Sequence, residues 1–356
     1  MQEISLVEIN KHFENPDHLI SIDRLTEWMG FREPESFYRM NPAEIANELE
    51  IDKMILLDIF LAGTIEGYFD LRWDYHCPCC NGIPGFSNHL KTMPSDSYCS
   101  ACSMEFRNTL DNNIEVTFST SSNFIEIPQS YIEEQTKKMI DLVMKKQYKM
   151  SSFYISGLDC FHNNFFHLHF SQDVLSVEES LEIKSVCILF TDIKGSTALY
   201  DKLGDVKAYK LVREHFKILF NVIEKNNGII IKTIGDSVMA SFQKPIDSIR
   251  ASFEMQEKIK SLIIPETENP LEVKFGIHQG NVIVVNLNDK LDYFGQTVNL
   301  SSRIQGLGKN NEIFFSEQIF NDLKVKEFLI ERVLELKKYT VSLRGITEEK
   351  NVFAVE

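Results

Sequence analysis

The chain has 356 residues, of which 43% are hydrophobic and 25% charged, and its formal net charge is −15. This length suits two or three domains, and this composition excludes a chain that is disordered throughout. The longest apolar runs are far shorter than the ~20 residues of a membrane-spanning helix, and the N-terminus lacks the apolar core of a signal peptide, so we expect a cytoplasmic protein without a membrane partner.

The negative charge is concentrated near the N-terminus. Residues 1–127 contain 8 Lys and Arg against 21 Asp and Glu, a net charge of −13, while the rest of the chain carries only −2. Because nucleic-acid binding depends on contacts from Lys and Arg to phosphates, this imbalance argues against a nucleic-acid partner and against an anionic membrane surface.

Residues 1–75 have the pattern of a small helical domain. Apolar spacing predicts a helix over 20–29, and Asn41 and Asp52 are suitable N-caps for two more helices. The alternation of residues 68–75 predicts a strand. Three helices followed by a strand resemble a winged helix, so we describe this region as winged-helix-like.

Residues 76–127 contain two pairs of cysteines with the spacing of a zinc site. Each pair has the form Cys-x-x-Cys, which is typical of tetrahedral thiolate coordination of Zn²⁺. The expected ligands are Cys77, Cys80, Cys99 and Cys102. Four protein ligands would make the metal structural, in a zinc-ribbon-like module with strands over 114–118 and 124–127. The alternatives are free thiols, or a site in which Cys79 replaces Cys80. His76 and His89 are nearby alternate ligands, which we interpret as surface histidines.

Residues 128–183 are predicted to be a helix and a linker. Their amphipathic pattern indicates a helix over 130–149, and residues 165–170 suggest a strand. Four potential metal ligands crowd together here: Cys160, His162, His167 and His169. We interpret them as ordinary residues of this segment rather than as a haem or metal sensor.

From residue 184 the pattern alternates between strands and helices. Strands are predicted over 185–191, within 229–242, and over 271–277, 281–285, 311–316 and 351–355; helices are predicted over 206–226, 245–263 and 297–307. The segment 229–242 has the pattern of two strands that meet at Gly235-Asp236. We expect an α+β fold in which helices cover a sheet.

Two aspartates in this region are placed to bind metal ions. Asp192 follows a buried strand, and Asp236 lies at the tip of the predicted hairpin. A pair of divalent ions held by such carboxylates can clamp the attacking and leaving oxygens of a phosphoryl transfer, and Mg²⁺ binds through one or two carboxylates together with substrate phosphates. For each residue taken alone, the alternative is a solvated aspartate in a turn.

Four segments resemble the signature motifs of the class III nucleotide cyclases. They are FTDIKGST (190–197), KTIGDSVMASF (232–242), FGIHQG (275–280) and DYFGQTVNLSSR (292–303), in the family's order. The resemblance covers residues 184–356. It implies a ferredoxin-like α+β catalytic domain that acts as a head-to-tail homodimer, with active sites at the interface.

The resemblance also assigns roles to single residues. Asp192 and Asp236 match the aspartates that bind two Mg²⁺ or Mn²⁺ ions. Lys232 and Asp292 match the residues that read the base, and this pair goes with ATP because Lys can donate to adenine N1 while a carboxylate accepts from the N6 amino group. Guanylate cyclases resemble this arrangement but have Glu and usually Cys at these two places.

Three further residues match the phosphate and ribose contacts of the family. Asn299 and Arg303 lie four apart on one predicted helix face, where Asn299 would position the ribose and Arg303 would neutralise charge on the α-phosphate. Arg344 stands where the family usually has a lysine for the terminal phosphates, so the charge is kept and the shape differs.

The sequence therefore predicts an adenylate cyclase that makes 3′,5′-cyclic AMP and pyrophosphate from ATP and is regulated by its N-terminal region. Residues 1–127 also resemble an uncharacterised region found ahead of some bacterial class III cyclases, through SIDRLTEWMGF, FDLRWDYHCPCC and CSAC. The alternatives are a guanylate cyclase, a catalytically silent nucleotide sensor, and a nucleic-acid-binding regulator built on residues 1–127.

Overall fold

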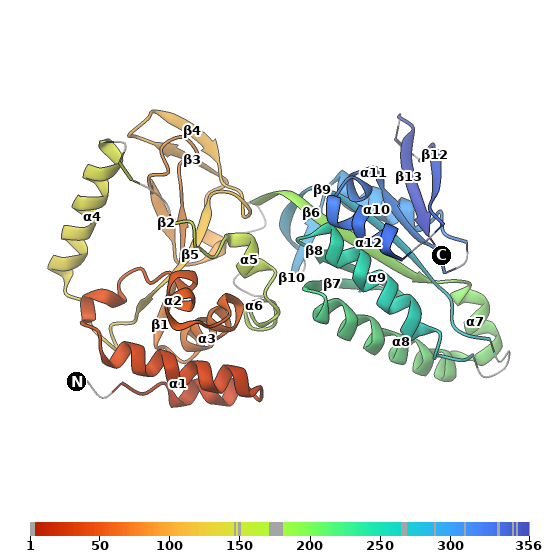
Figure 1. Cartoon of the computed structure of the whole chain (residues 1–356), viewed down its shortest axis with the longest axis horizontal. Coiled ribbons are helices and arrows are strands. Elements are labelled where there is room, and N and C mark those ends of the chain that lie inside the picture. The colour runs from red at the N-terminus through yellow and green to blue at the C-terminus, as the bar shows by residue number, and fades with distance from the viewer. Residues whose placement is uncertain are drawn as a thin grey trace. The chain divides into compact units, whose positions relative to one another are not determined.

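The computed structural model describes residues 4–145, 147–148, 151–170, 181–264, 269–287, 290–309, 311–332, 335–343, 345–346 and 348–355. The chain forms two compact units, one made of Met1–Glu182 with Val285–Lys290 and the other of Ile183–Val284 with Leu291–Glu356. Figure 1 shows the elements of both units. No helix within these described ranges is both long and apolar enough to cross a bilayer.

The first unit begins with helices whose starts are set by side-chain caps. The elements are η1 (Val7–His12), α1 (Pro16–Gly30), η2 (Pro34–Phe37), α2 (Pro42–Leu49) and α3 (Lys53–Ile65). The caps predicted at Asn41 and Asp52 are confirmed, because each side chain accepts hydrogen bonds from two backbone N–H groups. The first helix starts earlier than predicted, because the side chain of Asn15 caps it and Pro16 occupies its first position.

A three-stranded antiparallel sheet follows, in the order β2-β1-β5. Its strands are β1 (Phe69–Tyr75), β2 (Gly85–Ser87) and β5 (Ile114–Thr120). One face packs on α3, where the ring of Phe60 lies 4.7 Å from Phe69 and 4.9 Å from Phe118. The other face is polar. The strand predicted over 124–127 is wrong: the backbone N–H groups of Phe124 and Ile125 bond to the carbonyl of Ser121 and form a turn.

The rest of the first unit consists of short elements. They are η3 (Leu90–Thr92), the β3 (Asp96–Cys99) and β4 (Met104–Arg107) hairpin, α4 (Gln129–Met144), α5 (Gly157–Phe161) and α6 (Asn164–His169). The strand suggested over 165–170 is wrong, because the side chain of Asn163 caps a helix there. The winged-helix and zinc-ribbon likenesses of this unit remain interpretations.

The second unit is built on an eight-stranded sheet in the order β12-β13-β11-β9-β6-β8-β7, with β10 paired to β9. The strands are β6 (Leu181–Ile193), β7 (Gly228–Ile234), β8 (Ser237–Phe242), β9 (Val273–Leu287), β10 (Lys290–Phe294), β11 (Ile313–Ser316), β12 (Lys337–Val341) and β13 (Lys350–Val355). The two strands predicted around Gly280 are one continuous strand, β9, because the chain passes Gly280 without a turn.

Helices cover both faces of this sheet. They are α7 (Ser196–Leu203), α8 (Asp205–Lys225), α9 (Pro245–Ile259), α10 (Gln296–Gln305), α11 (Glu317–Phe320) and α12 (Leu323–Glu331). The main core joins α8, α9 and α12 to one face, and Figure 1 shows α8 and α9 side by side over the strands. On the other face, Ile304 of α10 packs with Phe314, Val352 and Ala354. The predicted α+β fold with helices over a sheet is confirmed.

Candidate active site and metal centre

The two predicted metal-binding aspartates come together at one end of the sheet. Asp192 lies near the end of β6 and Asp236 in the turn between β7 and β8, and β8 pairs with β6. The backbone N–H of Ile193 donates to Asp236 Oδ2 at 3.1 Å, and Ser237 Oγ donates to Asp192 Oδ1 at 2.7 Å. Each aspartate therefore accepts a hydrogen bond from the residue that follows the other aspartate in the chain.

The electrostatics of the pair suit a divalent cation. Burial raises the pKa of Asp236, and the neighbouring charge of Asp192 raises this pKa further. Two carboxylates that repel each other in this way offer the hard oxygen ligands that Mg²⁺ and Mn²⁺ prefer. Sequence reasoning missed Lys274, whose Nζ lies 3.9 Å from Asp192 Oδ2 and partly offsets the negative charge.

The start of α7 lies beside these carboxylates. Gly195 has a φ of +67°, which lets the chain turn sharply from β6 into the helix. The Ser196 side chain hydrogen-bonds to Asp236, so the first turn of α7 contacts the aspartate pair. The free N–H groups of a helix N-terminus favour phosphate oxygens.

Lys232 and Asp292 are brought into direct contact. Lys232 is on β7 and Asp292 on β10, and Lys232 Nζ donates to Asp292 Oδ2 at 2.5 Å. The lysine side chain is 35% exposed and that of the aspartate 11%. The backbone N–H of Tyr293 donates to the other oxygen of Asp292 at 2.8 Å, which orients the carboxylate. Together they present a donor and an acceptor side by side.

Asn299 and Arg303 lie on α10, beside a pocket of about 500 Å³. The helix is seated close to the sheet: Ser301 Oγ donates to the carbonyls of Ile188 and Gly276 at 2.6 and 3.0 Å. Both predicted residues line the pocket, and Lys350 of β13 lines it too. The sequence analysis did not predict Lys350 as a site residue, because no motif contains it. Its position at the start of β13 brings it to the pocket.

The structure thus assembles three pairs: Asp192 with Asp236, Lys232 with Asp292, and Asn299 with Arg303. No hydrogen bond or ion pair between described residues joins one pair to another. Arg344 lies outside the described residues.

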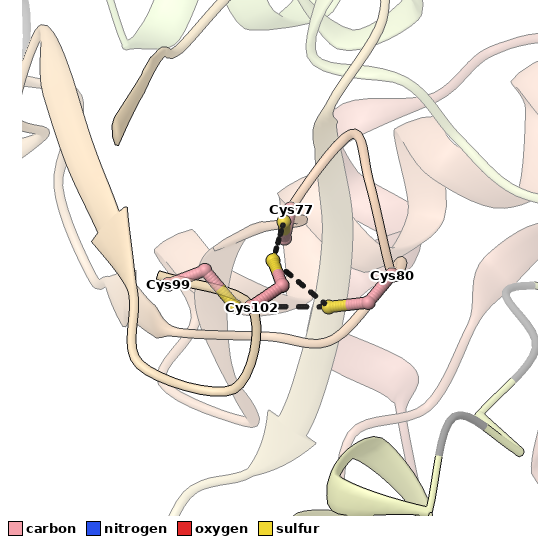
Figure 2. Close-up of side chains that lie close together, drawn as sticks. All are labelled: Cys77, Cys80, Cys99 and Cys102. Atoms are coloured by element: carbon pink, nitrogen blue, oxygen red, sulfur yellow. Dashed lines mark hydrogen bonds between the residues drawn. The ribbon is translucent and has the colours of Figure 1, made fainter. Parts of the chain in front are cut away.

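The four predicted zinc ligands form one cluster (Figure 2). Their sulfur atoms all lie within 4.8 Å of one another, and they are the one group of three or more potential ligands among the described residues. The distances are 3.4 Å between Cys77 and Cys102, 3.6 Å between Cys80 and Cys99, and 3.9 Å between Cys102 and Cys80. Four sulfurs at ~2.3 Å from a tetrahedral ion lie about 3.8 Å apart, so the cluster fits Zn²⁺.

The surroundings of the cluster match a structural role. Cys77 and Cys99 are buried and pack with Phe106, and the last two residues lie on β3 and β4. Burial raises the pKa of the Cys77 thiol, but hydrogen bonds from the backbone of Cys80 and Cys79 and from the side chains of Cys102 and Cys80 together outweigh it and lower the pKa. The side chain of Cys79 is exposed and outside the cluster, so Cys79 does not replace Cys80.

Among the described residues, the histidines near residue 165 do not belong to a group of side chains that could bind a metal ion. His162 directly follows α5, and His167 lies within α6. Burial lowers the pKa of His162 to about 3 and that of His167 to about 4. They belong to the interior of the first unit, in keeping with the interpretation of ordinary residues.

Comparisons with known proteins cover both halves of the chain. Residues 178–353 match the family described as adenylate and guanylate cyclase catalytic domain, and residues 2–192 match a family of unknown function (DUF5939). The second match extends well beyond the 1–127 region singled out from the sequence.

Several curated cyclases are similar to this chain. An adenylate cyclase from Anabaena cylindrica is 25% identical over 210 residues, which are 54% of this chain and 41% of that protein. Adenylate cyclase 1 from Rhizobium meliloti (strain 1021) is 27% identical over 36% of this chain and 21% of that protein. The human guanylate cyclase soluble subunit beta-2 is 27% identical over 42% of this chain and 26% of that protein. The chain therefore spans less than half the length of these relatives.

Among solved structures, the adenylyl cyclase CyaB from P. aeruginosa is 23% identical, with a TM-score of 0.43, over 50% of this chain and 96% of that chain. The chain therefore belongs, through residues 2–192, to the family of unknown function (DUF5939). Together with the three residue pairs, the other match identifies residues 178–353 as a class III adenylate and guanylate cyclase catalytic domain.

Proposed function

We propose that the protein is an adenylate cyclase that converts ATP to 3′,5′-cyclic AMP and pyrophosphate in a homodimer. The observation that carries the choice of ATP is the contact between Lys232 Nζ and Asp292 Oδ2. Adenine offers an acceptor at N1 beside a donor at N6, and this pair offers the complementary donor and acceptor. Guanine presents the opposite pattern and would leave partners unmatched, at about 1–3 kcal/mol for each buried group.

The other pairs act on the phosphates and the ribose. Asp192 and Asp236 would hold two Mg²⁺ or Mn²⁺ ions, which polarise phosphate oxygens when bound. Asn299 orients the ribose so that its 3′ oxygen faces the α-phosphorus. Arg303 donates to the α-phosphate oxygens as charge develops there and pyrophosphate leaves.

We propose a homodimer because one chain carries every catalytic role. Among the described residues, no hydrogen bond or ion pair connects Asp192 and Asp236 with Asn299 and Arg303. A head-to-tail dimer would complete two equivalent sites, with the aspartates from one chain and the other pairs from its partner.

For the N-terminal unit we propose a regulatory role. We also propose that a structural zinc ion stabilises its fold, bound by Cys77, Cys80, Cys99 and Cys102. The sulfur distances support the metal. The net charge of −13 over residues 1–127 disfavours a nucleic-acid ligand, so a small molecule or a protein is the better candidate for the input.

Turnover by the purified chain tests this proposal. ATP and GTP are supplied in parallel with Mn²⁺ or Mg²⁺, and both cyclic nucleotides are quantified, with Asp192→Ala as the inactive control. Cyclic AMP from ATP, absent in the control, supports the proposal. Preferred formation of cyclic GMP would establish a guanylate cyclase, and nucleotide binding without product from either substrate would establish a silent sensor.

A further inference from the structure

The first unit contains a pocket that none of the three residue pairs uses. Its volume is about 370 Å³, and it lies between the polar face of β1, the loop before β2, the β3–β4 hairpin and α4. The side chains that line it are mostly apolar, including Ile83, Phe86, Met139 and Val143. A largely apolar pocket with a few converging polar groups is the usual form of a small-molecule site.

The charged residues that line this pocket have an unbalanced charge. Among the described residues they are Arg39, Arg72 and Asp74, so two guanidinium groups share one carboxylate. The Asp74 side chain is 0% exposed, and it accepts from Arg39 Nη2 at 3.1 Å, from Arg72 Nη2 at 3.3 Å and from Thr117 Oγ1 at 2.7 Å. The residues that line the pocket therefore carry one net positive charge, and the buried carboxylate of Glu115, outside this lining, also acts on Arg39.

The protein satisfies the two guanidinium groups only in part, although the side chain of Tyr148 also hydrogen-bonds to Arg39. Arg72 Nε is buried and has no hydrogen-bond partner in the described part of the chain. Arg39 Nη1 points to the sulfur of Met139 at 3.3 Å, and a thioether is only a weak acceptor. Buried donors without acceptors are unfavourable, and a ligand oxygen would satisfy them.

The backbone holds Arg39 in an unusual conformation that directs it to this wall. Its φ is +52°, in the left-handed region. The next residue, Met40, forms a two-way backbone bridge with Phe118, and the N–H of Arg39 donates to Ser119 Oγ at 3.0 Å. Strained residues fixed by their surroundings often belong to ligand sites.

The helix that closes the pocket is loosely packed. No residue of α4 is buried, and Ile140 is 55% exposed although it lines the pocket. At Gly82 an added Cβ would lie 2.5 Å from Val143 Cγ1, so α4 touches the loop closely at that one turn. A ligand in the pocket would bury apolar side chains of α4 that now face water.

We propose that this pocket binds a small organic carboxylate with an apolar or aromatic body. The carboxylate matches the planar guanidinium fork, the unsatisfied Arg72 Nε and the net positive charge of the lining. The body fits the apolar walls and the ring of Phe86, whose centroid lies 3.7 Å from the Arg72 guanidinium carbon. If the chain is the cyclase proposed above, this ligand is a candidate for its regulatory input; the binding itself does not depend on that function.

Calorimetry with the full-length chain tests the site without ATP. The probes are benzoate, octanoate and 1-naphthoate, with 1-naphthamide as the neutral counterpart of the last. We expect saturable binding of at least one carboxylate and at least tenfold weaker binding of the amide. Failure of all three carboxylates to bind at millimolar concentration, or equal binding of naphthoate and naphthamide, overturns the proposal.

Two variants of α4 locate the site. Ile140→Glu places a negative charge at the pocket and should weaken carboxylate binding at least tenfold, while Leu142→Glu, on the same helix but outside the pocket, should leave it unchanged. Both positions are more than 40% exposed, so both variants should fold. Equal effects of the two variants would place the ligand elsewhere. The rate of cyclic nucleotide formation with and without the carboxylate then reports regulation separately.

Discussion

Lys232 Nζ and Asp292 Oδ2 lie 2.5 Å apart, although 60 residues separate them in the chain. The two charges neutralise each other between β7 and β10, at the place where the purine is expected. We expect an adenine base that binds here to separate the two groups and to replace their contact with two hydrogen bonds of its own.

Removal of one member of this pair should damage both binding and selectivity. Lys232→Ala leaves the Asp292 carboxylate, which is 8% exposed, without its cation. We expect kcat/KM for ATP to fall roughly 10- to 100-fold, equivalent to ~1–3 kcal/mol. The double variant Lys232→Glu with Asp292→Cys should raise the ratio of cyclic GMP to cyclic AMP. An unchanged ratio would show that these residues do not contact the base.

Mixing of inactive variants tests the shared active site. Asp192→Ala and Arg303→Ala should each be inactive alone, but random mixing should restore about a quarter of the wild-type rate, because half of the dimers then contain one intact site out of two. Asp192→Ala mixed with Asp236→Ala provides the matched control and should restore nothing, since both changes affect the same chain's contribution. Recovery in the control, or none in the first mixture, contradicts the proposed dimer.

The position of α10 depends on a glycine of β9. A Cβ added at Gly276 would lie 2.1 Å from the backbone nitrogen of Gln305. Gly276→Ala should therefore displace α10 and with it Asn299 and Arg303, lowering kcat and destabilising the fold by about 1–3 kcal/mol. Gly306→Ala is the control: its nearest contact is 3.4 Å and its φ is −64°, so it should behave as wild type. Thermal unfolding and initial rates measure both effects.

The cysteine cluster should hold about one zinc ion per chain. Cys99→Ser should lose the metal and lower the melting temperature of the first unit, because four sulfurs that face each other under a short hairpin rely on the ion to hold them. Cys79→Ser changes an exposed cysteine outside the cluster and should keep the metal. Elemental analysis of the purified variants decides this, and loss of zinc in both would disprove the ligand assignment.

A buried histidine should make the second unit sensitive to acid. Burial lowers the pKa of His215, on α8, to about 4. Between about pH 6.5 and pH 4 the unfolded chain therefore binds a proton that the folded chain does not, so stability falls as the pH falls. His215→Leu should remove on the order of 1–2 kcal/mol of the difference in unfolding free energy between pH 7 and pH 5. Denaturant titrations at both pH values measure it; equal pH dependence in the two proteins argues against the assignment.

Local sequence patterns were sufficient for much of this protein. The caps at Asn41 and Asp52 and the hairpin around Asp236 were predicted correctly, because each depends on interactions within a few residues. The cyclase motifs likewise identified the catalytic domain, since each motif is a short run of residues that can be recognised without the fold.

Tertiary structure decided what depends on distant partners. Whether residues 165–170 are strand or helix was settled by the cap at Asn163 and by the packing of Phe166 against Trp73, with ring centroids 5.7 Å apart. The contact of Lys232 with Asp292 arises only because the fold of the second unit brings β7 and β10 together. The pocket beside Arg72 arises only where α4 lies near β1 in the first unit. Periodicity alone cannot predict them, because side chains far apart in the chain become neighbours only through sheet pairing and helix packing.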